Sequence, residues 1–329
     1  PVIVYEDGRP VEFSALPLLS YPKEECTSFS SISELLEHYY AEKNTYTRIR
    51  QRSVDLRKIV QTILERDVKK YDLQLRQLKD TEKREKFKVY GELTQTYGYG
   101  LKPNAKSLTC MNYYTNEEIT IPLDPTKTPL ENSKKFFAKY NKLKRTYEAL
   151  SQLTMETKAE VDHLESVSSA LDIALEENDL VQIKEELMEF GYVKKRRANE
   201  KRPKITSKPF HYISSDGYDI FVGKNNYQNE ELTFKVASGN DWWFHAKGIP
   251  GSHAIVKSNG QADLPDRVFE EAGALAAYYS KGRENDKVEI DYIQKKNIKK
   301  VAGAAPGFVI YHTNYSLVAS PRCDLKEVK

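Results

Sequence analysis

The chain has 329 residues, a formal net charge of +3 and a mean hydropathy of −0.67. Charged residues make up 30%, more than is usual for one globular domain, which indicates long solvated helices and about two domains. No apolar run is long enough for a transmembrane helix or a signal peptide, so we expect no membrane association. The three cysteines, Cys26, Cys110 and Cys323, lie far apart, which argues against disulfides and fits a reducing, cytoplasmic location.

Residues 1–30 are predicted to form a β-hairpin. Val2–Tyr5 and Val11–Phe13 flank Asp7-Gly8, which is a strong signal for a two-residue turn. Because an isolated hairpin is marginal in water, we expect it to pack at the base of the helices that follow or on a segment upstream.

Residues 31–190 carry the pattern of a helical arm. Ser31 and Glu34 form a capping-box pair, and neither Pro nor Gly occurs from Ser31 to Tyr90. Apolar residues recur on three- and four-residue steps with one drift, which predicts a heptad seam on one uninterrupted helix. The seam consists of Leu35, Tyr39, Tyr46, Ile49, Leu56, Val60 and Ile63, and then Leu64, Val68, Tyr71, Leu75 and Leu78.

A second seam follows later in the chain. Its members are Phe136, Tyr140, Leu143, Tyr147, Leu150, Thr154, Thr157, Val161, Leu164, Ser168, Leu171 and Leu175. Two seams of compatible length on one chain favour an antiparallel coiled-coil hairpin, with a parallel homodimer as the alternative.

A tip insert at about residues 91–132 separates the two helices. Lys106–Met111 and Glu118–Pro122 are predicted strands around a turn at Tyr113–Asn116. The insert either contacts a partner or only closes the hairpin. Its exposed tyrosines and three lysines suggest the partner; the lysines are Lys102, Lys106 and Lys127.

A basic linker, residues 191–208, follows an acidic helix predicted at 176–190. It contains Lys194, Lys195, Arg196 and Arg197. A charge run of this kind is usually solvated, but its position before an aromatic-rich domain also fits phosphate neutralisation.

Residues 209–329 have the composition of a compact mixed α+β domain. Phe210–Ile213 and Tyr218–Gly223 are predicted strands, and Lys224–Asn229 is predicted to be a polar loop. A helix is expected at Pro265–Ser280, and Phe308–His312 and Ser316–Ala319 are expected to close the sheet. A basic patch consists of Lys295, Lys296, Lys299 and Lys300.

The stretch Asn240–His253 holds both tryptophans and interleaves charged residues with aromatics. It is either a half-buried strand ending at a Pro-Gly turn or a surface that binds a ligand. Ser252 and His253 would point to opposite faces of a strand, which argues against a nucleophile and base. Asp241, His245 and His253 supply at most three zinc ligands, at irregular spacing, and no phosphate-binding Gly loop occurs. We therefore expect no catalytic residue, metal or cofactor, and binding of single-stranded or looped RNA fits better.

Three stretches resemble the NFACT-R domain, which is the C-terminal domain of the proteins of the RqcH/NEMF/FbpA (fibronectin-binding protein A) family. They are Asp216–Asn229, Asp241–Lys247 and Pro250–His253. The resemblance extends over the coiled-coil region and covers essentially the whole chain. The upstream stretches similar to bacterial members are Asp7–Phe13, Tyr90–Leu93, Ile119–Pro125 and Lys139–Arg145.

The resemblance implies a role in ribosome-associated quality control. Members of this family bind a large ribosomal subunit obstructed by peptidyl-tRNA, recruit alanyl-tRNA and support template-free alanine tailing of the stalled chain. Peptide transfer belongs to the ribosome, so this chain is not expected to be an enzyme. The family's NFACT-N domain is expected to lie outside it. The alternatives are a surface adhesin that binds fibronectin and a coiled-coil scaffold that dimerises.

The resemblance also implies which residues face RNA. Asp241 is further expected to orient His245 or Lys247, and strand alternation places one of Trp242 and Trp243 on each face. The RNA-facing candidates are Lys224, Asn225, Asn226, Asp241, Trp243, His245, Lys247, Ser252, His253 and Lys257.

Overall fold

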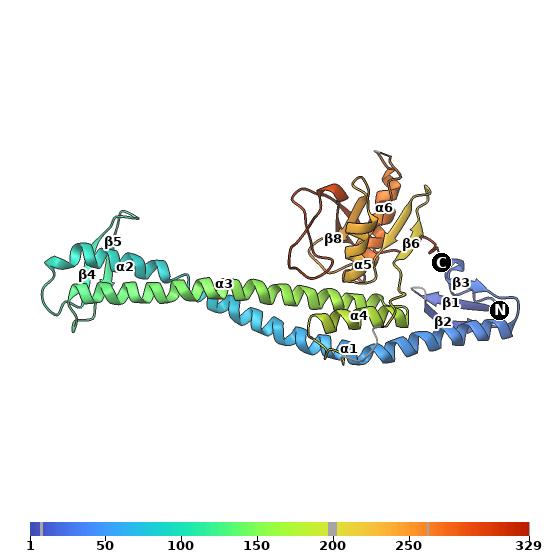
Figure 1. The fold of residues 1–329 in the computed structure, drawn as a ribbon, viewed down its shortest axis with the longest axis horizontal. Coiled ribbons are helices and arrows are strands. Elements are labelled where there is room, and N and C mark those ends of the chain that lie inside the picture. Colours follow the sequence, from blue (N-terminus) through green and yellow to red (C-terminus); the bar gives the residue numbers. More distant parts are fainter. Residues whose placement is uncertain (7–8, 197–202, 262, 329) are drawn as a thin grey trace. The chain divides into compact units, whose positions relative to one another are not determined.

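A computed structural model describes residues 1–6, 9–196, 203–261 and 263–328 (Figure 1). The chain divides into two compact units, one formed by residues 1–64 and 162–329 and the other by residues 65–161. Among these described residues, no helix is both long and apolar enough to cross a membrane. The fold belongs to the predicted α+β class, with a long helical region and a β-rich C-terminal domain.

The first unit begins with a small sheet of order β2-β1-β3. The predicted hairpin is confirmed, because β1 (Val2–Glu6) pairs antiparallel with β2 (Arg9–Ser14). Its turn, Asp7-Gly8, lies outside the described residues. A third strand, β3 (Cys26–Ser28), follows the short helix η1 (Lys23–Glu25) and was not predicted. Ile3 packs on the first turns of helix α1 (Ile32–Asp80).

Three helices pack together in the same unit. These are α1, the C-terminal part of α3 (Pro129–Ile173), and α4 (Glu177–Glu189). Arg57 of α1 donates hydrogen bonds to the Asp172 carboxylate and the Leu171 carbonyl of α3. The predicted acidic helix is confirmed as α4. The shared core contains Ile49, Leu56, Val60, Leu164, Leu171, Ile183 and Leu187.

In the second unit the predicted uninterrupted helix is broken. α1 ends at Asp80, and α2 (Arg84–Tyr97) starts after a short turn. The Thr81 hydroxyl and amide both donate to the Leu78 carbonyl, at 2.6 and 3.0 Å. This local bonding competes with the helical ladder, and it ends the helix without Pro or Gly.

The seams in this unit run antiparallel, as predicted. Lys70 lies 3.8 Å from Glu160, and Arg84, further along the chain, lies over the ring of Tyr147. The predicted drift of the first seam is wrong. Val68 and Leu75 are exposed, whereas the neighbouring Asp67 and Gln74 are buried, because the original seven-residue spacing continues. The side chain of Tyr46 lies outside the described part. On α3, Thr154, Thr157 and Val161 are buried as predicted.

The tip contains the two predicted strands, β4 (Ser107–Asn112) and β5 (Glu117–Pro122). They follow η2 (Gly98–Gly100), and their apolar side chains Leu108 and Ile121 pack with Leu93 of α2. Alternation along these short strands therefore buries one face on the helices.

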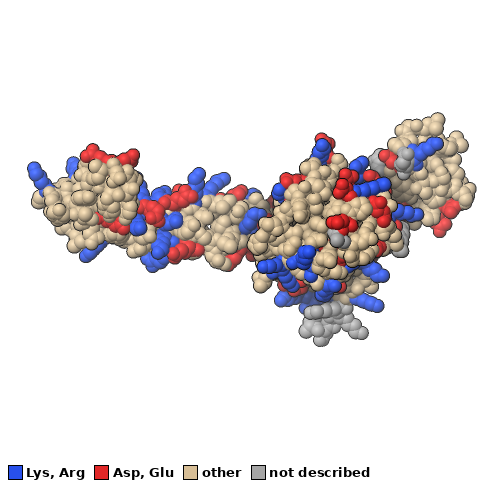
Figure 2. Space-filling view, turned by 90° about the horizontal axis from the view of Figure 1, so that it is seen from above, with Lys and Arg blue, Asp and Glu red and all other residues tan. Residues whose placement is uncertain are grey.

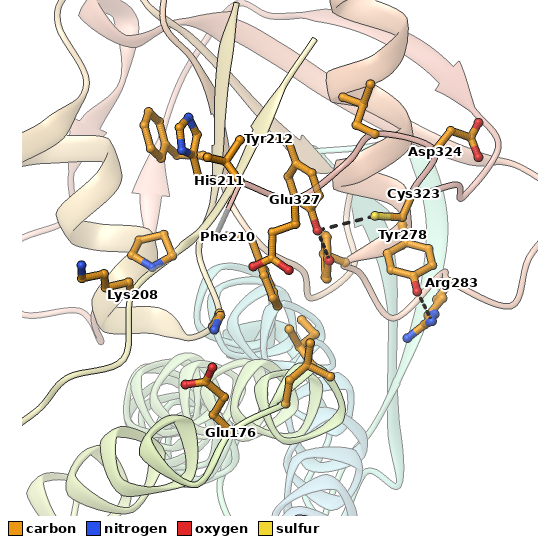
Figure 3. A pocket seen from close by; sticks show the side chains of 18 of the residues that line it. Glu176, Lys208, Phe210, His211, Tyr212, Tyr278, Arg283, Cys323, Asp324 and Glu327 are labelled. Carbon is orange, nitrogen blue, oxygen red and sulfur yellow. Dashed lines mark hydrogen bonds between the residues drawn. The ribbon is translucent and has the colours of Figure 1, made fainter. Parts of the chain in front are cut away.

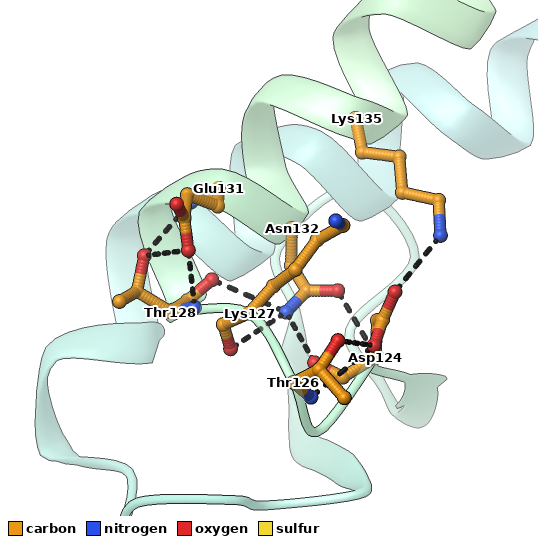
Figure 4. A network of polar contacts seen from close by, with 7 residues as sticks. All are labelled: Asp124, Thr126, Lys127, Thr128, Glu131, Asn132 and Lys135. Carbon is orange, nitrogen blue, oxygen red and sulfur yellow. Dashed lines mark hydrogen bonds and ion pairs between the residues drawn. The ribbon is translucent and has the colours of Figure 1, made fainter.

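An amide at the start of α3 fixes the loop that leads into it (Figure 4). The Asn132 side chain accepts from the Asp124 amide at 2.9 Å and donates to the Asp124 carbonyl at 3.0 Å. Hydrogen bonds from Thr126, and then the cation of Lys135, lower the pKa of Asp124 to about 2. Thr128 and Glu131 cap α3 reciprocally.

The C-terminal domain is built on one antiparallel sheet of order β13-β10-β8-β9-β7-β6. Helix α6 (Asp266–Tyr278) packs on one face (Figure 1). The π-helix η3 (Leu232–Val236) packs on the other. The strands are β6 (Phe210–Ile213), β7 (Asp219–Val222), β8 (Trp242–Ala246), β9 (Ala254–Val256), β10 (Val288–Gln294) and β13 (Tyr315–Ala319).

Two local predictions in this domain are wrong. The polar stretch expected as a loop contains helix α5 (Asn226–Glu231), because the Asn225 side chain caps it by accepting from the Gln228 amide. The segment expected to close the sheet, 308–312, instead contains β12 (Val309–Ile310). After the turn η4 (Lys295–Asn297), β11 (Lys299–Lys300) returns to pair with β12 in a separate ladder.

Candidate nucleic-acid interface

The amide residues that open α5 are buried against the helices of the first unit. The Asn225 amide donates to Gln182 Oε1 of α4 at 2.8 Å. The Asn226 amide donates to Glu186 Oε1 at 2.7 Å and to Ser166 Oγ of α3 at 2.8 Å. These bonds hold the C-terminal domain on α3 and α4. The surrounding chain therefore uses the hydrogen-bonding groups of Asn225 and Asn226, which were expected to read RNA.

The charged groups in this contact have polar partners within the fold, except that Glu186 Oε2 has no hydrogen-bond partner among the described residues. Glu186 is fully buried and lies 2.8 Å from Nε2 of buried His163. Lys224 is buried, with its Nζ 3.6 Å from Asp179 Oδ1 and 4.5 Å from the centre of the Phe210 ring. Burial of a lone charge would be costly, so these pairings explain how the sequence tolerates them. This burial and pairing argue against the expected contact of Lys224 with phosphate.

The two tryptophans of β8 lie on opposite faces of the sheet. Trp243 is 1% exposed and packs with Ile255 and Ile293 beneath η3. Trp242 is half-buried on the α6 face, beside Phe269. Alternation was predicted correctly, but the choice of Trp243 as the outward ring is wrong, because its face of the strand is covered by η3.

His245 and His253 lie next to each other and to Trp243. Their rings are 5.4 Å apart, and Thr233 Oγ1 is 2.7 Å from His253 Nδ1. Burial lowers the pKa of His245 to about 4, and burial together with the neighbouring His245 lowers the pKa of His253 well below its ordinary value. Neither ring carries a positive charge at neutral pH, so neither can neutralise a phosphate there.

Ser252 and His253 form hydrogen bonds with different parts of the domain, not with each other. The Ser252 amide donates to the Tyr279 carbonyl at 2.9 Å, and the His253 amide donates to Asn229 Oδ1 at 3.0 Å. Both side chains are buried. Within the part of the chain that the structure covers, no group of three or more His, Cys, Asp or Glu side chains could hold a metal ion.

The Asp241 carboxylate, at the start of β8, joins the loop before β8 to the loop after β9. It accepts from the amides of Ser238 at 2.7 Å and Ser258 at 2.9 Å and from the Lys257 ammonium. Burial opposes its ionisation, but the hydrogen bond from Lys257 and the two amide bonds outweigh it and lower the pKa of Asp241. The expectation that Asp241 orients His245 or Lys247 is wrong: it binds Lys257 and two loop amides.

The exposed cations form a strip at the end of the sheet where β10 leaves it. Lys296, Lys299 and Lys300 are exposed, Lys295 is half-buried, and Lys300 also pairs with Glu230. The Lys295 amide donates to the Asp241 carbonyl at 2.9 Å, and the Lys296 amide donates to the Gly239 carbonyl at 3.0 Å. We call Lys295, Lys296, Lys299 and Lys300 the lysine strip.

The other predicted cations are less free or lie elsewhere. Lys247 is exposed but pairs with Glu289, and Lys257 is held by Asp241. Lys194 and Lys195 are exposed, Arg196 pairs with Glu185, and Arg197 lies outside the described residues. Figure 2 shows Lys and Arg on the lower side of the part of the first unit that faces the viewer, with Asp and Glu more frequent above them.

A hollow of about 1760 Å³ lies in the first unit beside β6 (Figure 3). Aromatic rings line it, and the Tyr212 hydroxyl lies 2.6 Å from the Tyr279 hydroxyl and 3.5 Å from Cys323 Sγ. Burial raises the pKa of both tyrosines. Cations such as Lys208 and acids such as Glu327 are mixed around the rim, so the hollow has no consistent charge for a phosphate chain.

Comparison with known proteins identifies both parts of the chain. Residues 1–206 match the model of the NFACT N-terminal and middle domains, and residues 208–312 match that of the NFACT protein RNA binding domain. The chain belongs to the NFACT family. The matching models cover nearly all of it, from the small N-terminal sheet to strand β12.

Several relatives of this NFACT chain are named Rqc2 homolog RqcH. The one from Streptococcus suis is 42% identical over 96% of the chain and 57% of the relative. The one from Bacillus subtilis is 35% identical over 98% and 56%. The chain thus spans a little over half the length of these relatives. Coiled-coil domain-containing protein 25 of Bos taurus is 29% identical over 30% of the chain and 50% of its own length.

One solved structure resembles much of the chain. It is titled as the C-terminal part of the fibronectin/fibrinogen-binding protein from Streptococcus suis. It is 37% identical, with a TM-score of 0.64, and the match covers 84% of this chain and 97% of that one.

The sequence did not reveal the residues of α4 that accept hydrogen bonds from Asn225 and Asn226 at the start of α5. Gln182 and Glu186 lie on the buried face of α4, next to Ile183 and Leu187. The available signal was two polar residues four positions apart within the apolar stripe of an amphipathic helix. Such residues require buried partners, but the pattern could not name partners 40 or more residues away.

Proposed function

We propose that this NFACT chain is the RNA-binding part of a ribosome-associated quality-control factor. The observation that carries this proposal is the match of residues 208–312 to the NFACT RNA binding domain, together with RqcH relatives that align over almost the whole chain. In finer terms, the proposed partners are the obstructed large ribosomal subunit, its peptidyl-tRNA and alanyl-tRNA. The proposed outcome is alanine tailing in the cytoplasm, with the chain binding RNA and catalysing no reaction itself.

The lysine strip supports RNA as the partner. It places four lysines on one short segment, three of them exposed, and such clusters of lysines can neutralise a phosphate backbone. The buried state of Trp243, His253, Asn225 and Asn226 restricts contacts to the remaining surface. Phosphate binding at the strip would be independent of sequence, because such contacts carry no base information.

The proposal is tested by binding of the purified chain to tRNA and to large ribosomal subunits at several salt concentrations. We expect affinity to fall steeply with salt, because bound lysines release counterions from RNA. Replacing Lys295, Lys296 and Lys299 by Ala should lower the affinity and reduce the salt slope by about one for each lost contact.

A charge-matched control distinguishes loss of the lysine strip from a general loss of positive charge. Lys184, Lys287 and Lys326 are exposed and lie outside the strip, so their replacement by Ala removes the same charge. The control should keep most of the affinity. Absence of RNA binding at low salt would reject the proposed function, and equal losses in the two triple variants would reject the strip as its site.

The second candidate is binding of a host glycoprotein at the cell surface. It is favoured by the Streptococcus suis structure, whose title names fibronectin and fibrinogen. Immobilised fibronectin and intact cells labelled with antibody against the chain would test it. Saturable binding of fibronectin, together with surface labelling, would favour this function, whereas labelling only after lysis would reject it.

A further inference from the structure

The seam between α1 and α3 in the second unit buries polar side chains that are not fully bonded. Asp67 and Gln74 of α1, seven residues apart, are 1% and 7% exposed. We call these two residues the polar layers. Asp67 Oδ1 accepts from Arg66 Nε at 2.9 Å, but Asp67 Oδ2 and Gln74 Oε1 have no hydrogen-bond partner within the described part of the chain. Such atoms destabilise the packing that buries them, because they have lost water without gaining a partner.

The opposite helix does not supply the missing bonds. Lys70 of α1 lies 3.8 Å from Glu160 of α3. Because the two helices run antiparallel, Gln74, one turn later on α1, lies level with Thr157, about one turn earlier on α3. Thr157 is 1% exposed, and its hydroxyl also lacks a partner among the described residues. Two buried polar groups that stay unbonded do not fix one arrangement of the helices, as a fully bonded network would.

Apolar side chains lie outside the seam, directly beside the polar layers. Val68 and Leu75 follow the two polar layers in sequence and are 37% and 40% exposed. We call Val68 and Leu75 the apolar flank. Together with three half-buried residues they form a wholly apolar stripe on alternating steps of four and three residues, which is the spacing of a coiled-coil seam. This apolar stripe consists of Leu64, Val68, Tyr71, Leu75 and Leu78.

A small turn of α1 about its own axis would exchange the two sets. The described seam and the apolar stripe share Tyr71 and Leu78, and their centres lie about 50° apart, half of the roughly 100° between successive helical residues. Such a turn would bury the apolar flank and return the polar layers to water, and both changes are favourable. The described phase is favoured in turn by continuity, because Asp67 and Gln74 keep the seven-residue spacing of buried Val60. The sequence therefore supports both arrangements.

The break at the end of α1 leaves room for this turn. α1 ends at Asp80, and α2 starts at Arg84. The core beyond the break contains Leu93, Leu108 and Ile121, and among the described residues α1 contributes no side chain to it. A rotation of α1 can therefore be taken up in the three residues of the break, while the tip keeps its own packing.

We propose that α1 has two packing phases against α3 in the second unit: the described one, and a second in which the apolar flank replaces the polar layers in the seam. The inference goes beyond the proposed function and does not depend on which partner the chain binds. A partner that binds one phase more tightly than the other would shift the population towards it, so the seam is a two-state element that binding can control. In the competing arrangement, the apolar flank is only the edge of a seam with a single phase.

The test is methyl relaxation-dispersion NMR on the full chain, which detects exchange between conformations on the microsecond-to-millisecond timescale. The reporters are the methyl groups of Leu64 and Leu78, which belong to the apolar stripe. In the parent chain both should show exchange with one common rate. Leu93, in the core beyond the break, should show none.

Two pairs of substitutions should each abolish the exchange at both reporters. Asp67→Leu with Gln74→Leu makes the described seam apolar and so favours the described phase. Val68→Gln with Leu75→Gln removes the apolar side chains that the second phase would bury. Fraying of α1 would respond differently, because loss of the apolar flank would increase it.

The matched control is Lys69→Leu with Arg76→Leu. These exposed positions are also seven residues apart, and they lie on the opposite side of α1 from both stripes, so the control adds the same two leucines outside the seam. It should keep the exchange. Absence of exchange in the parent chain, exchange that survives either pair of seam substitutions, or loss of exchange in the control would reject the two phases. RNA binding takes no part in this measurement, so its failure would leave the proposed function untouched.

Discussion

The two most recognisable stretches of the C-terminal domain differ in composition and exposure from the lysine strip and Tyr315. Lys224–Asn229 and Trp243–His253 are rich in amides, imidazoles and indole, yet most of these side chains are buried and bonded within the chain. Lys296, Lys299, Lys300 and Tyr315 are exposed, although they lie outside these two stretches. The difference teaches that an unusual group of polar and aromatic residues can identify a joint in the fold as readily as a ligand site.

The largest expected effect separates the two tryptophans. Trp243→Ala should lower the free energy of unfolding by about 3–5 kcal/mol, because it leaves a cavity beneath η3. Trp242→Ala removes a half-buried ring and should cost about 1–2 kcal/mol. Urea denaturation followed by circular dichroism would measure both. Equal losses would contradict the division of the two rings into core and surface.

A smaller effect concerns His245, which is half-buried beside His253. His245 has its pKa lowered to about 4, so between the ordinary value of 6.5 and 4 the unfolded chain binds a proton that the folded chain excludes. Stability is therefore complete above about pH 6.5 and falls on acidification, by on the order of 2–3 kcal/mol near pH 4.5. Urea midpoints between pH 7 and 4.5 would show this loss.

The matched variants assign that pH dependence. His245→Gln should remove part of the loss, whereas His312→Gln, at an exposed position, should leave it unchanged. An acid sensitivity that is identical in His245→Gln and the parent chain would show that other groups cause it.

The smallest of the three effects breaks the contact between α5 and the helices. Asn226→Ala removes the hydrogen bonds to Glu186 and Ser166 and should cost about 2 kcal/mol, because one of them is made to a buried carboxylate. Asn297→Ala, at an exposed residue, should change stability by less than about 0.5 kcal/mol. A loss of RNA affinity in Asn226→Ala without loss of stability would instead assign Asn226 to the RNA surface.

Periodicity predicted most of the elements. The seams on α1 and α3, the tip strands, α4, α6 and most strands of the sheet follow from apolar spacing and turn residues. The break at Thr81 did not follow, because a side-chain hydroxyl ended the helix where no Pro or Gly marks it. The phase of the seam near Asp67 was also missed, because a buried carboxylate looks like a surface residue in sequence.

The site was harder to predict than the fold. Alternation placed Trp242 and Trp243 on opposite faces but could not say which face η3 covers. Likewise, the amides of Asn225 and Asn226 look free in sequence because Gln182 and Glu186 lie 43 and 40 positions earlier. Exposure depends on such distant contacts, and a local pattern does not contain them.

The contact between α5 and α4 also has a practical consequence for dividing the protein. The two matching family models meet between residues 206 and 208, which suggests a natural place to cut. A fragment ending there would keep Glu186 and Gln182 but lose Asn225, Asn226 and Gln228, to which they are bonded. Glu186 and Gln182 also lack these partners during synthesis, because α4 is made some 40 residues before Asn225 and Asn226. We therefore expect the two halves to be less soluble when expressed separately than when expressed as one chain.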